Sequence, residues 1–322
     1  MLRYFIIFFS NLSSVIDYQQ DMKTITKTLL LLFSIIHFTC INPREMPDKM
    51  PAKSEIVAKT TSPNYGKNLI KIEVDSSSNQ YVFYGVNNSF LPYLLEVEFT
   101  QILNLDPATK SYRSIIEPGK SRLFELKTRQ KKSITKYNYK YNYSRGNPDL
   151  SPDANFPYLI PLSQIKKTAI NIIHGAGGFI PALLIVNAGD TVYSMRKGKV
   201  TAIPNGNTKV DSSTPTFLEI YHHDGTLGSY NGNSMITLVN LGDYVYPGQP
   251  VGVMKQHGMI SINVYRFSKN HYGPIPIQYT VDGATLLTLE QINGVAALHP
   301  VQVIQKELSE SELKKYQNRN LY

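Results

Sequence analysis

Residues 189–193 read Gly-Asp-Thr-Val-Tyr and residues 242–246 read Gly-Asp-Tyr-Val-Tyr, so one five-residue pattern occurs twice in the C-terminal half of the chain. Both copies lie in β-like segments, AGDTVYSMRKGKVTAI (188–203) and LVNLGDYVYPGQPVGVM (238–254), in which β-branched and aromatic residues are separated by turn residues. Glycine supplies the positive φ that such turns need. The repetition predicts two similar hairpins and a quasi-duplicated β-domain.

The N-terminal half also consists of short β-like runs separated by turn residues. They are residues 69–74, 80–86, 93–100, 122–127 and 134–144. The last run, ITKYNYKYNYS, alternates tyrosine with asparagine and lysine, so one face of its strand is aromatic and the other polar. Tyrosines at this spacing more often form the buried face of a sheet than a ligand platform. Strands at this density predict a β-sandwich over residues 68–150.

The remaining segments complete an all-β chain. Two further β-like runs, residues 217–230 and 258–267, place the second β-domain at residues 158–303. The tail, residues 304–322, contains Ser309 and Glu312 at the spacing of a capping box, which predicts a short C-terminal helix.

Composition excludes several classes of site. The chain has 322 residues, a net charge of +9, one cysteine and seven histidines. One cysteine cannot form an internal disulfide or a multi-cysteine metal site, so histidines and carboxylates are the remaining candidate metal ligands. Lysine and arginine are scattered singly along the chain, so we expect no nucleic-acid partner.

The N-terminal residues predict export. Residues 22–40 read MKTITKTLLLLFSIIHFTC, a basic start followed by a short apolar run, which is typical of a secretory signal peptide. We therefore expect Met22 to be the natural start, residues 1–40 to be a mis-called start plus a leader, and the protein to be secreted, periplasmic or in the cell envelope. The apolar residues 1–10 leave a membrane anchor as the competing interpretation.

Cys40 leaves a second alternative open. It stands where a bacterial lipoprotein carries its acylated cysteine, so lipid anchoring, as in an outer-membrane lipoprotein, competes with simple secretion. The only contact with a membrane that we expect is through the leader or this anchor. Residues 41–67 are rich in Pro, Lys, Ser and Thr and predict a linker.

Three segments of the second domain resemble the lysostaphin-type zinc metallopeptidases, endopeptidases that cut peptidoglycan with a duplicated-hybrid-motif β-fold. Residues 189–200 are similar to the first strand-turn-strand of that family, residues 219–230 to its His-x-Asp-Gly-Thr stretch, and residues 242–252 to its second hairpin. The N-terminal sandwich also resembles that of some secreted bacterial members. The resemblance implies the same fold here.

The ligand positions that this resemblance implies are largely replaced. In the family, zinc is held by a His and an Asp before the first hairpin and by the second His of a His-x-His strand, and another His assists the bound water. The His-x-His strand corresponds to Ile260-Ser261-Ile262, and the Asp to Leu183. The assisting His corresponds to Gly232, and only His174 can fill a ligand position. The full set of degenerate groove positions is His174, Leu183, Tyr230, Asn231, Gly232, Asn233, Ile260 and Ile262.

These replacements predict a non-catalytic relative, a pseudoenzyme with no metal and no cofactor. We expect it to bind peptidoglycan or an envelope protein through the zinc-less groove. An active zinc endopeptidase is the alternative, with a metal site rebuilt from His174, His222 or His223, His257 and Asp224. A structural module of a surface complex is the third possibility.

The other histidines and one lysine complete the candidates. His222 and His223 are adjacent, so on a strand their side chains point to opposite faces and cannot share one metal. We expect His257, His271 and His299, near turns, to lie at the surface. The hairpin pattern also occurs in biotinyl and lipoyl domains, for which Lys197 is the nearest candidate for modification, but its flanking residues do not match.

Overall fold

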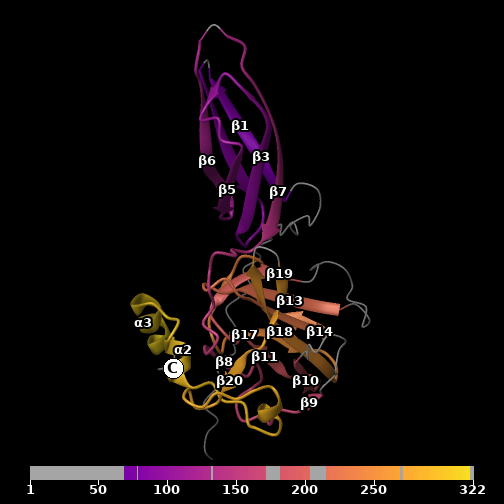
Figure 1. Cartoon of the computed structure of the whole chain (residues 1–322). Coiled ribbons are helices and arrows are strands. Elements are labelled where there is room, and N and C mark those ends of the chain that lie inside the picture. The colour runs from indigo at the N-terminus through magenta and orange to yellow at the C-terminus, as the bar shows by residue number, and fades with distance from the viewer. Residues whose placement is uncertain are drawn as a thin grey trace, which may run out of the picture. The chain divides into compact units, whose positions relative to one another are not determined.

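The computed structural model describes residues 69–77, 79–131, 133–171, 182–203, 215–268 and 271–319 (Figure 1). These residues belong to one compact unit. The predictions for Met22, Cys40 and residues 1–40 and 41–67 lie outside the described residues, as does His174. Within the described ranges, no helix combines the length and the hydropathy that crossing a membrane requires.

Two antiparallel sheets form the N-terminal lobe. The first has the order β1 (Ile70–Ser77), β2 (Gln80–Asn87), β6 (Gly119–Thr128) and β4 (Leu105–Asp106), and the second has the order β5 (Ser111–Ile116), β3 (Tyr93–Leu103) and β7 (Lys136–Arg145). Apolar side chains from both sheets form one core, in which Phe83, Val97 and Ile116 are buried.

The tyrosine run forms β7 and faces this core, as its alternation predicted. Tyr137, Tyr139 and Tyr141 are partly buried and pack against the core of the lobe. The ring of Phe83 contacts Tyr137 and Tyr139 edge to face at centroid distances of 5.5 and 5.6 Å, an arrangement that aromatic pairs favour. Only Tyr143, at the end of the run, is largely exposed.

The C-terminal lobe is built on one large antiparallel sheet. In spatial order its strands are β16 (Tyr244–Val245), β12 (Gly198–Ala202), β13 (Pro215–Tyr221), β14 (Leu227–Asn233), β18 (Gly258–Ser268), β10 (Ala182–Val186) and β9 (Ile170–Asn171), and β19 (His271–Ile275) also pairs with β18. A three-stranded sheet has the order β11 (Thr191–Tyr193), β17 (Pro250–Met254) and β15 (Met235–Thr237), and β8 (Pro157–Leu159) runs parallel to β20 (Gln278–Thr280).

The two copies of the Gly-Asp-x-Val-Tyr pattern pair reciprocally. Strand β11 of the first copy pairs with β17, which follows the second copy, while β16 of the second copy pairs with β12, which follows the first. The turns repeat the same hydrogen bonds: Gly189 N–H donates to the carbonyl of Met254 (2.8 Å), and Gly242 N–H donates to that of Val200 (2.9 Å). Both glycines have positive φ. The repeated sequence therefore produces two pseudo-symmetric strand-turn-strand segments. The prediction of two hairpins is wrong, because the two strands of each copy lie in different sheets and do not pair with each other.

Short helices follow the sheets. They are the 3₁₀ helix η1 (Glu290–Ile292), α2 (Val301–Gln305) and α3 (Glu310–Arg319). The backbone N–H of Ser309 donates to Oε2 of Glu312 at 2.8 Å, and the N–H of Glu312 donates to Oγ of Ser309 at 3.4 Å. This reciprocal pair is the capping box that the sequence predicted. Sheets dominate and the helices are short, so the predicted all-β class with a short C-terminal helix is confirmed.

The pseudo-symmetric glycines allow a matched test of the fold. A Cβ at Gly242 would lie 2.6 Å from Cε1 of Phe90, whereas a Cβ at Gly189 would meet no atom within 4 Å. Gly189→Ala therefore tests the positive φ alone and should lower the free energy of unfolding by about 1 kcal/mol. Gly242→Ala also forces the new Cβ against Phe90, and this overpacking should lower it by about a further 1–3 kcal/mol. Urea unfolding should show Gly242→Ala to be the less stable variant. Equal losses would mean that Phe90 does not pack against this turn in solution.

Candidate functional site

Strands β10, β18 and β14 are the three adjacent strands that carry most of the predicted groove positions. Ile260 lies opposite Gly232 and Leu184, and Ile262 lies opposite Tyr230, in the antiparallel register. Residues directly opposite each other, and residues two apart on one strand, point to the same face. Because Leu184 and Tyr230 are fully buried, this is the inner face of the sheet.

The inner face is hydrophobic core. Tyr230, Ile260 and Ile262 are at most 2% exposed and belong to the main cluster of the lobe. The hydroxyl of Tyr230 accepts a hydrogen bond from Met195 N–H at 2.8 Å, and burial raises its pKa. The prediction that these residues line an open groove is therefore wrong, since each is covered by the packing of the lobe.

The opposite face of the same strands is partly exposed. Leu183 pairs with Ser261, which also pairs with Asn231, so these three side chains share this outer face. We expected Leu183 to lie on the same face as Ile260 and Ile262. It lies on the opposite face of the sheet, so that expectation is wrong. A shift of one residue along a strand moves a side chain to the other face. On β18, the outer-face positions in this part of the strand are Ser261 and Asn263, and Ser261 lies directly opposite Leu183.

We call the outer face of β14, β18 and β10 the amide face, because Asn231, Ser261 and Asn263 supply its polar groups. Nδ2 of Asn263 donates to Oγ of Ser261 at 2.9 Å. Oδ1 of Asn263 is buried and has no hydrogen-bond partner among the described residues. An acceptor in this position costs free energy until a donor reaches it. Apolar side chains of Phe217 and Met259, 37% and 43% exposed, flank the polar groups.

The chemistry of this face suits peptide recognition better than metal binding. Zinc is held by imidazole, thiolate or carboxylate, and the described residues contain no group of three such side chains that could hold an ion. Ser261 is not activated as a nucleophile, since its described side-chain partner is an amide, which cannot accept its proton. The structure gives the strand position of Asn233 and no side-chain contact for it.

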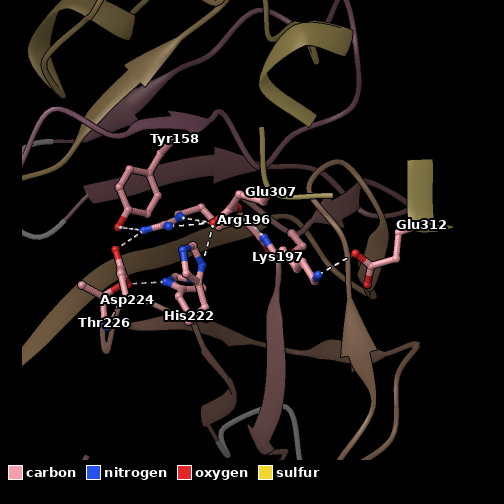
Figure 2. Close-up of polar contacts among 10 residues, drawn as sticks. Tyr158, Arg196, Lys197, His222, Asp224, Thr226, Glu307 and Glu312 are labelled. Atoms are coloured by element: carbon pink, nitrogen blue, oxygen red, sulfur yellow. Dashed lines mark hydrogen bonds and ion pairs between the residues drawn. The ribbon is translucent and has the colours of Figure 1, made fainter. Parts of the chain in front are cut away.

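A second polar cluster surrounds the side chain of Arg196, which is 1% exposed (Figure 2). Nη1 of Arg196 donates to Oδ2 of Asp224 at 2.6 Å and to the hydroxyl of Tyr158 at 3.2 Å. Nη2 and Nε donate to Oε1 of Glu307, at 2.6 and 3.1 Å. The guanidinium also stacks on Phe156, 3.6 Å from the ring centroid. A buried charge of this kind needs such partners on every side.

Asp224 and Thr226 determine which nitrogen of the His222 ring carries the proton. The Thr226 hydroxyl donates to Oδ1 of Asp224 (2.7 Å), so its oxygen accepts the proton on Nδ1 of His222 (2.8 Å). Burial lowers the pKa of His222 well below its usual range, and the nearby Arg196 lowers it further. The ring is therefore neutral with the proton on Nδ1, and Nε2 is a buried acceptor without a partner among the described residues.

The segment around α3 joins this cluster. Oε2 of Glu307, whose side chain is 2% exposed, accepts the backbone N–H of Lys197 at 2.8 Å. Nζ of Lys197 pairs with Glu312 at 2.7 Å, which does not suit a lysine awaiting covalent modification. Glu307 and Glu312 therefore tie the C-terminal residues to the β-domain through Arg196 and Lys197.

The candidates for a rebuilt metal site do not come together. His222 is fully buried, while the side chain of His223 is 70% exposed, and both lie in the turn between β13 and β14, not on a strand. His257 is exposed and its Nδ1 lies 3.0 Å from Oδ1 of Asn187. Asp224 is already engaged by Arg196 and Thr226.

The surface prediction for His299 is wrong, since its ring is buried and its Nε2 donates to the carbonyl of Ile160 at 3.1 Å. The side chain of His271 is not described.

Sequence reasoning missed the Arg196 cluster. Arg196 and Glu307 are separated by 111 residues, and nothing in the run SMRKGK distinguishes the buried Arg196 from Lys197 and Lys199, which are partly exposed. For Ser261 and Asn263 a signal existed: in ISINV, residues 260–264, apolar and polar residues alternate strictly. That alternation places the apolar residues inside and Ser261 and Asn263 outside.

Comparison with known proteins gives only distant likenesses. No family model matches the chain, and no curated protein matches it. A solved structure assigned as a glycyl-glycine endopeptidase, LytM, of Ruminococcus gnavus is similar over 38% of this chain at 15% identity, with a TM-score of 0.28, and the match covers 56% of that protein.

Two crystal forms of Helicobacter pylori Csd3 are similar over 79% of this chain, at 13% and 12% identity and TM-scores of 0.30 and 0.28. The match covers 78% and 76% of those chains. Likenesses at these values assign no activity to this chain.

Acid should weaken the fold through Asp224. Burial alone would raise the pKa of this carboxyl, but Arg196 and Thr226 outweigh burial and lower it from 3.8 to about 2. A depressed carboxyl pKa stabilises the fold above the unfolded-state pKa, and the effect is lost as the pH falls toward 2. The difference corresponds to about 2 kcal/mol.

The test compares the urea unfolding of wild type and Asp224→Asn from pH 7 to pH 2. The gap in the free energy of unfolding should be largest near neutral pH and should narrow by about 2 kcal/mol below pH 4. Asp75→Asn, at an exposed position of β1, is the control and should follow wild type. A gap independent of pH would show that the ion pair with Arg196 does not form.

Proposed function

We propose that the chain is a non-catalytic, peptidase-like protein of the bacterial cell envelope that binds peptide chains of peptidoglycan through the amide face. The single observation that carries this proposal is the identity of the outer-face residues. Strands β10 and β18, which carry the ligand positions that the family resemblance implies, present Leu183, Ser261 and Asn263 on one face.

The amide face offers what an extended peptide needs. Asn263 Oδ1 is a buried acceptor without a partner among the described residues, and it suits the N–H of a peptide bond. The exposed side chain of Asn231 supplies both a donor and acceptor on the neighbouring strand. Phe217 and Met259 add apolar contact at the edges. These groups can bind a peptide but cannot hydrolyse it, because none of them activates water or a serine.

Export supports the location of this function. The leader-like residues 22–40 direct the chain to the envelope, where peptidoglycan is found. Anchoring through Cys40 would hold the protein there, and secretion would release it. The proposal requires only that the amide face reach the cell wall.

The proposal is tested by sedimentation of the full-length protein with purified peptidoglycan sacculi. Wild type should co-sediment without releasing soluble muropeptides. Asn263→Leu removes the buried acceptor but keeps the side-chain size, so binding should fall about 10-fold or more, the effect of roughly one lost buried hydrogen bond. Asn138→Leu, on the exposed polar face of β7, is the matched control and should bind like wild type.

Two results would contradict the proposal. One is a wild-type protein that carries one zinc per chain and releases muropeptides, which would make the chain an active peptidase. The other is an Asn263→Leu variant that co-sediments as well as wild type while unfolding at the same urea concentration. Binding would then use another surface.

A further inference from the structure

A pocket of about 580 Å³ adjoins the Arg196 cluster, since Lys197, His222 and Glu307 contribute to its lining. Its floor is a row of side chains on three adjacent strands: Lys199 on β12 lies opposite both Tyr221 on β13 and Tyr244 on β16. Opposite residues share a face, so the lysine lies between two tyrosines. Phe90, Lys306 and His223 contribute to the walls. We call this the lysine pocket.

Lys199 is the unusual group in this pocket. Its Nζ lies 5.7 Å from the ring centroids of both Phe90 and Tyr244, within the range of a cation–π contact. Among the described residues no carboxylate lies within 4 Å of Nζ, although the nearby Lys197, two residues earlier in the chain, is paired with Glu312. Aromatic rings hold Lys199 in place and leave its charge available.

The acidic residues of the pocket do not neutralise Lys199. Oε1 of Glu307 is engaged by Arg196, and His223 Nδ1 lies 3.3 Å from the same atom. Glu117 is exposed and forms no ion pair among the described residues. Lys306, which also lines the pocket, is exposed and likewise forms no ion pair among the described residues. The pocket therefore presents two unpaired ammonium groups, from Lys199 and Lys306, and one unpaired carboxylate at Glu117.

The geometry points to a binding site for a sugar that carries an anionic group. The volume is that of a small-molecule site, and the ring of Tyr244, 62% exposed, offers a flat apolar surface beside a positive charge. A lysine binds carboxylate or phosphate as a point charge. The site goes beyond the amide face, because it would recognise an acidic sugar instead of peptide bonds. An acidic sugar could carry a carboxylate, as in N-acetylmuramic acid, or a phosphate, as in a sugar phosphate.

The test is isothermal titration of the full-length protein with three sugars of similar size. N-acetylmuramic acid and N-acetylglucosamine 6-phosphate carry the two anionic groups, and neutral N-acetylglucosamine is the reference. At least one acidic sugar should bind about 10-fold or more tightly than the neutral sugar, and 0.5 M NaCl should weaken that binding. Which acidic sugar binds identifies the source of the anion.

Lys199→Met is the decisive variant, because it keeps the aliphatic stem between the rings and removes the charge. It should lower the affinity for the acidic sugar about 10-fold or more and leave the affinity for neutral sugar unchanged. Lys314→Met, on the exposed part of α3, is the matched control and should bind like wild type. Sacculus binding through Asn263 is measured separately, so the two sites are distinguished.

Three outcomes would overturn the inference: no binding of either acidic sugar, equal affinity for acidic and neutral sugars, or wild-type affinity in Lys199→Met. Far-ultraviolet circular dichroism and the urea midpoint establish that Lys199→Met is folded. If that variant fails to fold, Tyr244→Ser, at an exposed position of the same row, replaces it and should weaken binding of the acidic sugar by removing the stacking surface.

Discussion

The C-terminal lobe depends on one constraint, the burial of a guanidinium at Arg196. A permanently charged group with five N–H donors can be withdrawn from water only where oxygen atoms replace the water. Here they come from three parts of the chain: Tyr158 on β8, Asp224 in the turn after β13, and Glu307 ahead of α3. This arrangement ties the C-terminal segment to the sheet, and the charge of Arg196 adds to the effect of burial in keeping His222 neutral.

In this lobe the residues that stabilise the buried charge of Arg196 are different from those that are available to bind a ligand. Asp224 and His222 look like catalytic groups in the sequence, yet their hydrogen bonds are internal to the cluster and serve the buried charge. Groups left with unused hydrogen-bonding or charge capacity lie elsewhere. Asn263 on the amide face has a free acceptor, and Lys199 in the lysine pocket has a free charge. Unused hydrogen-bonding or charge capacity of this kind is what a recognition site requires.

Much of the fold was predictable because local patterns determine it. Alternation of tyrosine identified β7 and its inner face, and Ser309 with Glu312 identified the start of α3. The candidate site was predicted less well. Counting positions along the family resemblance assigned Ile260 and Ile262 to the site, whereas the alternation within ISINV already assigned them to the core. Pairings such as Arg196 with Glu307 join residues remote in sequence, and no local pattern encodes them.

The reciprocal pairing of the two Gly-Asp-x-Val-Tyr segments has a consequence for how the lobe evolves and folds. Since β11 is completed by β17 and β16 by β12, neither copy satisfies its own backbone hydrogen bonds. One copy alone therefore cannot form a complete sheet, and a single copy moved into another protein would present unpaired strand edges. The two copies must be retained together, and substitutions in one are constrained by the partner strand of the other. Such entwined repeats close only after distant parts of the chain meet, which favours a single cooperative folding step over stepwise growth.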